Sequence, residues 1–141
     1  MVNRELASKA LKNAEEWLLS AKELDKTKVP SKVLYSLEMG IEMSLKALLI
    51  YHGIDFPKSH NILPVVANLI SSSEFDDTEI KKYSNELFSI FHALLDIRSA
   101  SGYSYESSFD NEFFLEKANR YVDPAFHIFE LIRKHINTEN K

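Results

Sequence analysis

The chain has no cysteine and few residues that break helices. Its 141 residues include only three glycines and four prolines. Without cysteine, the chain can form no disulfide, no thiolate metal site and no cysteine nucleophile. Few glycines and prolines, together with abundant Leu, Ala, Glu and Lys, favour long helices over a sheet. The composition therefore predicts an all-α fold.

Long apolar segments and excess positive charge are also missing. The longest apolar run, residues 47–51, is far shorter than the roughly 20 residues that span a bilayer. The N-terminus has no apolar stretch typical of a secretory signal. The formal net charge of −4 argues against broad, sequence-blind binding of nucleic acid, so any such site must be local. We expect one domain over residues 1–141, soluble and cytoplasmic, with no membrane contact.

Residues 31–53 form the segment around which we expect the other elements to pack. Placed at about 100° per residue, its apolar side chains form two stripes. The first stripe is Leu34, Leu37, Ile41, Leu45 and Leu48, and the second, of mostly small residues, is Val33, Gly40, Ser44 and Ala47. Two stripes imply at least two neighbouring helices. Because glycine is unfavourable inside a helix, we expect Gly40 to lie where another helix approaches closely.

The polar part of this central helix is one narrow row. Glu38, Glu42 and Lys46 follow one another at intervals of four residues. This spacing places them on one face, with Glu42 and Lys46 in the favourable order for an ion pair. The row is either a solvated edge of the helix or the border of a site.

Four further segments have helical periodicity. One covers residues 3–24, another ends near residue 71 after a cap at Ser59 or Asn61, and a third runs from a cap at Asp76 or Asp77 to about residue 100. The last covers residues 111–136 and contains Pro124, where we expect a kink rather than a restart capped by Asp123. Residues 99–110 form the longest loop.

A candidate site follows from the expected topology. Arg98 occupies a position of the fourth helix at which the apolar periodicity predicts a buried hydrophobic residue. If the helices run up and down, the end of helix two, the start of helix three and the end of helix four share one end of the bundle. The side chains that would converge there are Lys46, His52, His60, Arg98, Tyr103 and Tyr105. Such a pocket would suit a phosphate or a nucleotide.

Each of these side chains also has a simpler interpretation. Arg98 could complement a helix C-terminus or pair with Glu42 or Glu38. His60 could be a surface residue, and the tyrosines could pack the loop. The five histidines lie on different segments, and the Glu-x-x-His motif of di-iron bundles is absent. We therefore predict no metal and no cofactor.

Three features in order resemble the HEPN (higher eukaryotes and prokaryotes nucleotide-binding) family over nearly the whole chain. They are residues 37–49, the segment 57–63 (Pro-Lys-Ser-His-Asn-Ile-Leu) and Arg98. The resemblance implies an up-and-down bundle of four to five helices, often a homodimer. Many relatives are toxins or immunity proteins that cleave RNA without metal through an Arg-x4–6-His motif. Others pair with a small nucleotidyltransferase or bind nucleotides without cleaving them.

The chain departs from that motif after the arginine. Arg98 matches, but Tyr103 stands at the x4 position and Tyr105 at x6. Tyrosine, with a reference pKa of about 10 against about 6.5 for histidine, is a poor general base at neutral pH. Tyr103 could instead donate a hydrogen bond to phosphate or stack on a base. If the protein is an enzyme, Arg98 and Tyr103 are the expected catalytic residues. His60 could instead supply the imidazole that the motif histidine provides in relatives.

Two functions from different classes follow. We prefer a homodimeric module that binds a nucleotide, RNA or a partner protein, in a toxin–antitoxin-like or nucleotidyltransferase-associated system. The alternative is a metal-independent endoribonuclease toxin that uses Arg98 with Tyr103 or His60. The expected ligand-binding residues are Glu42, Lys46, His60, Arg98, Tyr103 and Tyr105. We further expect Glu42 to orient the Arg98 guanidinium.

Overall fold

The computed structural model describes residues 3–102 and 110–138, except for the side chains of residues 99–102. The described ranges contain five α-helices and no strand, which confirms the all-α prediction. The helices are α1 (Arg4–Glu23), α2 (Pro30–Tyr51), α3 (Leu63–Ser71), α4 (Thr78–Gly102) and α5 (Asn111–Thr138). In these ranges no helix is both long enough and apolar enough to cross a membrane.

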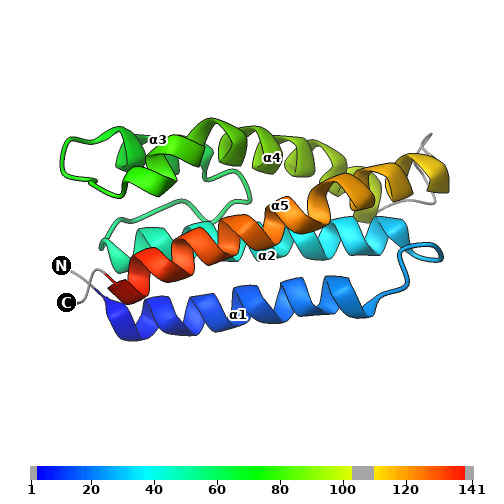
Figure 1. Cartoon of the computed structure of the whole chain (residues 1–141), viewed down its shortest axis with the longest axis horizontal. Coiled ribbons are helices and arrows are strands. Elements are labelled where there is room, and N and C mark those ends of the chain that lie inside the picture. Colours follow the sequence, from blue (N-terminus) through cyan, green and yellow to red (C-terminus); the bar gives the residue numbers. More distant parts are fainter. Residues whose placement is uncertain (1–2, 103–109, 139–141) are drawn as a thin grey trace.

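The four long helices form an up-and-down bundle. α2 and α5 lie between α1 and α4, and both ends of the chain lie at the same end of the bundle (Figure 1). At that end, the Asn3 backbone N–H donates to the Tyr51 carbonyl oxygen at 3.3 Å, so α1 and α2 are antiparallel. α3 is short, with nine residues, and packs beside α4.

Side chains cap two of the helices, and Asp77 is one of the two caps predicted for α4, whereas α3 begins after Ile62 rather than after the cap predicted at Ser59 or Asn61. Asn3 accepts a hydrogen bond from the Leu6 backbone N–H at 3.1 Å, and Asp77 accepts one from Ile80 at 3.0 Å. Each carboxylate or amide oxygen thereby satisfies a backbone donor that has no partner within its helix. At the other end of α2, Gly53 has a positive φ of 69°, a conformation that glycine adopts without strain. These local signals explain why α1, the end of α2 and the start of α4 lie where the sequence pattern places them.

α2 is the central helix, as predicted, and Gly40 lies at its closest approach to α1. A Cβ atom at Gly40 would be 2.5 Å from Leu18 Cδ2 and 3.5 Å from the Ala14 carbonyl oxygen. Leu18 is fully buried, so little space exists for it to move. The small residue therefore allows α1 and α2 to pack more tightly than any larger residue would.

α5 runs through Pro124 as one helix, Asn111–Thr138. The restart with Asp123 as a new cap is therefore wrong, and the bend angle at Pro124 stays a prediction. Packing of the long apolar stripe of α5 on α2 keeps the helix continuous although proline lacks the backbone donor.

One element of the expected topology is wrong. Arg98, near the end of α4, contacts Tyr35 and Glu38 in the first half of α2 rather than the end of α2. Since α3 is too short to cross the bundle, α4 starts at the end of α2 and runs antiparallel to it. The end of α4 and the end of α2 therefore lie at opposite ends of the bundle (Figure 1).

Candidate functional site

A cluster of charged side chains lies between α2 and α4. Glu38, Glu42 and Lys46 come from α2, His60 from the connection between α2 and α3, and Arg98 from α4. Glu38 is 0% exposed and Glu42 is 2% exposed. Charged residues are rarely buried so fully unless they are paired. The row on α2 is therefore not a solvated edge.

Arg98 is held by groups on the first half of α2. Its Nε lies in close contact with Glu38 Oε1. Its Nη2 donates to the Tyr35 hydroxyl oxygen at 3.2 Å and lies 3.8 Å from Met39 Sδ. The guanidinium carbon is 5.0 Å from the centre of the Tyr35 ring, within the range of a cation–π contact. Glu38, rather than Glu42, is thus the carboxyl group that positions Arg98.

Glu42 pairs with two other groups. Its Oε2 accepts a hydrogen bond from Lys46 Nζ at 2.9 Å, and its Oε1 lies 2.9 Å from His60 Nδ1. An ionised carboxylate only accepts hydrogen bonds, so Nδ1 must carry the proton of the imidazole. In neutral His60, the lone pair is therefore on Nε2. Glu42 fixes both the orientation and the tautomer of this ring.

The pKa values of the two buried carboxyl groups are shifted in opposite directions. Burial, with the neighbouring Glu42, raises the pKa of Glu38 to about 8, although Arg98 acts in the opposite direction. Burial would also raise the pKa of Glu42, but hydrogen bonds from Glu38, Lys46 and His60 outweigh it and lower that pKa. The Glu38 carboxyl group contacts both Glu42 and the Arg98 Nε, and these two neighbours shift its pKa in opposite directions.

This arrangement leaves the cluster positively charged. When Glu38 is neutral, the two cations Arg98 and Lys46 face the single carboxylate of Glu42. Arg98 is 22% exposed at its side chain and His60 is 49% exposed. Both line one pocket of about 280 Å³, together with Asn61, Leu63, His92, Leu95 and Asp96. The pocket therefore offers a guanidinium and an imidazole to an anionic ligand.

Comparison with protein families identifies the fold. The model of the HEPN domain family matches residues 7–135, nearly the whole chain. The chain belongs to the HEPN domain family. Its helical bundle agrees with that assignment, and at the level of the family the domain is a module related to nucleotides and RNA. Comparisons with curated proteins and with solved structures gave no significant match.

The HEPN domain brings together four of the ligand-binding residues that the sequence predicted: Glu42, Lys46, His60 and Arg98. Tyr103 and Tyr105 lie outside the described residues, so their roles stay predictions. His52 does not join this cluster, because its Nε2 lies 2.8 Å from His135 Nε2 at the opposite end of the bundle. The 52–62 connection turns back along α2 and brings only His60 to Glu42.

Two residues of the candidate site in this HEPN domain were not among the ligand-binding residues predicted from the sequence. Glu38 was considered only as an alternative partner of Arg98, because its burial depends on the position of α4. His92, whose Nδ1 lies 3.4 Å from Asp96 Oδ2, shares the pocket with Arg98 and His60. The only signal for His92 was its position on the same helix as Arg98, which was too weak to distinguish it from a surface histidine.

The carboxyl groups of this cluster also have the spacing of metal ligands. One ligand atom from each of Glu38, Glu42 and His60 lies within 4.8 Å of the others. However, Arg98 and Lys46 already contact the two carboxyl groups, and each cation disfavours a second positive charge nearby. The charge distribution of the cluster suits an anion better than a metal cation.

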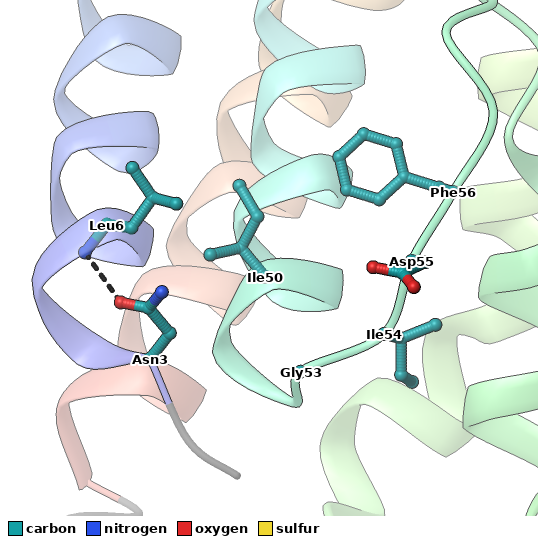
Figure 2. Close-up of a pocket in the computed structure, with 7 residues that line it drawn as sticks. All are labelled: Asn3, Leu6, Ile50, Gly53, Ile54, Asp55 and Phe56. Carbon is teal, nitrogen blue, oxygen red and sulfur yellow. Dashed lines mark hydrogen bonds between the residues drawn. The ribbon is translucent and has the colours of Figure 1, made fainter.

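A larger pocket of this HEPN domain has the wrong chemistry for a phosphate. It has a volume of about 590 Å³ and lies where the start of α1 meets the end of α2 (Figure 2). Its lining is Asn3, Leu6, Ile50, Gly53, Ile54, Asp55 and Phe56. This lining is mostly apolar and contains a carboxylate but neither a cation nor a histidine. The smaller pocket at Arg98 is therefore the better candidate site.

Proposed function

We propose that this HEPN domain binds the phosphate group of a nucleotide or of RNA in the pocket of Arg98 and His60. One observation carries the proposal: Arg98, positioned by Glu38, and His60, positioned by Glu42, line the same pocket, and both side chains are partly exposed there. A guanidinium held in this way can pair with phosphate oxygens. His60, positioned by Glu42, adds a second hydrogen-bonding group to the same pocket.

Binding of a labelled single-stranded RNA tests this proposal. Arg98→Gln removes the cation but keeps a side chain that can donate hydrogen bonds. We expect at least a tenfold weaker affinity, measured by fluorescence anisotropy at fixed salt concentration. Arg120→Gln is the matched control, because Arg120 is exposed on α5 and pairs with Glu116. An equal loss in both variants would indicate only a general effect of charge.

A second candidate function is RNA cleavage without metal, and the contact between Glu42 and His60 favours it. Because Glu42 keeps the proton on Nδ1, Nε2 of His60 can accept the proton of a ribose 2′-hydroxyl. The 2′-oxygen then attacks phosphorus, the bond to the 5′-oxygen breaks, and that oxygen takes up a proton. Arg98 would stabilise the charge on the phosphate oxygens. Tyr103 is the alternative partner of Arg98.

Incubation of RNA in the presence of a chelator separates the two functions. A nuclease of this kind would release products with a 2′,3′-cyclic phosphate, and His60→Asn would abolish their formation. Retained cleavage in His60→Asn would exclude His60 and favour Tyr103, which Tyr103→Phe would test. RNA binding without any cleavage would leave the binding module as the function.

The cellular role is also a proposal. We propose a homodimer in the cytoplasm, in a toxin–antitoxin-like or nucleotidyltransferase-associated system, with a small nucleotidyltransferase as partner. Membership of the HEPN domain family supports this role, since its members are often dimeric. Sedimentation of the purified protein would test the dimer, and co-purification with a neighbouring gene product would test the partner.

A further inference from the structure

A second pocket continues the candidate site along α4. It has a volume of about 550 Å³ and is lined by Leu63, Phe88, Ser89, His92, Ala93 and Asp96. Three of these residues, Leu63, His92 and Asp96, also line the pocket of Arg98 and His60. The two pockets therefore form one continuous groove on the outer side of α4, which we call the α4 groove.

The chemistry of the α4 groove changes along its length. Arg98 and His60 lie at one end, whereas Phe88 and Ala93, beside Ser89, make the other end mostly apolar. Phe88 and Leu63 are partly buried and pack on the core, which holds them in place. The groove thus joins a site for an anion to a site for a flat apolar group.

We propose that the Phe88 end of the α4 groove is a nucleobase subsite, so that the protein takes a nucleotide with its phosphate at Arg98 and its base against Phe88 and His92. This inference rests on the proposed function. Aromatic side chains stack on nucleobases with little dependence on the base. His92 and Phe88 precede Arg98 by six and ten residues, separations of roughly 9 Å and 15 Å along the helix axis, so a diphosphate at Arg98 has to contribute part of the length. A nucleoside diphosphate can span such distances.

Asp96 lies between the two ends and explains how the sugar would be held. Asp96 lines both pockets, and its carboxylate, 3.4 Å from His92 Nδ1, would repel a phosphate placed at the centre of the groove. The same carboxylate can accept a hydrogen bond from a ribose hydroxyl. This distribution of charge favours one direction of the nucleotide, with the phosphate at Arg98 and the neutral sugar beside Asp96.

Calorimetric titration with inorganic pyrophosphate and with ADP tests the subsite, because the two ligands share a diphosphate and differ in the nucleoside. The wild type should bind ADP at least tenfold more tightly than pyrophosphate. Phe88→Ala should lose that difference and keep its affinity for pyrophosphate. Phe126→Ala, which changes a partly buried phenylalanine on α5, should keep both affinities. In the wild type, ADP but not pyrophosphate should shift the ring signals of Phe88 and His92 in NMR spectra.

Several outcomes would overturn the inference. If neither ligand binds, the proposed function itself fails. If pyrophosphate binds and ADP binds no more tightly, or if Phe88→Ala keeps the preference for ADP, only the nucleobase subsite fails. If Phe88→Ala dissociates a dimer in sedimentation and leaves ADP binding intact, a second copy of the chain covers this end of the groove. The NMR shifts keep the test decisive if Phe88→Ala does not fold.

Discussion

Arg98 of α4 contacts the fully buried carboxyl group of Glu38 in α2, and burial raises the pKa of that carboxyl group to about 8. While the carboxyl group keeps its proton, the contact positions the guanidinium without cancelling its charge. A buried pair of full charges would instead have neutralised Arg98 and would have been costly to desolvate. Function and stability are therefore linked through the protonation state of one acidic residue.

The first prediction concerns Glu38 and the pH dependence of stability. In the unfolded chain its carboxyl group ionises near its ordinary pKa of 4.5, whereas in the folded protein the pKa is about 8. Between these values the folded state holds more protons, so the free energy of unfolding should fall as the pH rises and level off above about 8. The loss contributed by Glu38 should be on the order of a few kcal/mol.

Glu38→Gln should remove this contribution, because the amide stays neutral at every pH. Urea unfolding at about pH 5 and about pH 8 measures the difference for the wild type and the variant. Glu116→Gln, at an exposed position of α5, is the control and should keep the wild-type difference. An unchanged pH dependence in Glu38→Gln would show that Glu38 is ionised in the folded protein.

The second prediction concerns the close approach of α1 and α2. Gly40→Ala should destabilise the protein by about 1–3 kcal/mol, because the new methyl group would overlap the buried side chain of Leu18. The higher helix propensity of alanine would stabilise α2 by about 1 kcal/mol. The cost of the overlap with Leu18 must therefore be larger than this gain. In a Leu18→Ala background, Gly40→Ala should be neutral or stabilising. Urea unfolding of the wild type, Gly40→Ala, Leu18→Ala and the double variant completes a double-mutant cycle. A stabilising effect of Gly40→Ala in the wild-type background would contradict this explanation.

The third prediction concerns a hydrogen-bonded series at the end of the bundle where the chain begins and ends. His135 Nδ1 lies 2.8 Å from Asp77 Oδ2, and His135 Nε2 lies 2.8 Å from His52 Nε2. Burial, and then the charge of His135, lower the pKa of His52 below its ordinary 6.5, although Asp76 opposes this. Below about pH 6.5 the unfolded state therefore binds more protons at this position, and stability should fall as the pH decreases.

His52→Gln should reduce this loss of stability at acidic pH. Melting temperatures at about pH 7.5 and about pH 5.5 measure the effect. His127→Gln, at an exposed histidine of α5, should retain the wild-type difference. If the wild type and His52→Gln lose stability equally on acidification, the lowered pKa of His52 is not the cause of the pH dependence.

The sequence predicts the local features of this fold well, since they depend on residues close together in the chain. Apolar periodicity locates the helices, Asn3 and Asp77 cap two of them, and Gly40 marks a close approach. The candidate site is only partly predictable. Arg98 stands out because it interrupts an apolar line, but its partner Glu38 depends on the direction in which α4 crosses α2.

Contacts between distant segments account for what the sequence did not predict. The short α3 reverses the expected direction of α4, and this places Arg98 beside the start of α2. The same reversal brings His92 into the pocket. The pairing of His52 with His135 joins the ends of two helices that are far apart in the chain, and no local pattern indicates it.

Titration of the wild type and of Arg98→Gln with inorganic pyrophosphate, followed by calorimetry, tests the central claim most directly. Pyrophosphate contains only the phosphate groups that Arg98 is proposed to bind. The account predicts saturable binding to the wild type and to Arg120→Gln, with at least a tenfold weaker affinity for Arg98→Gln. Equal affinity of the wild type and Arg98→Gln, or no binding to the wild type, would contradict it.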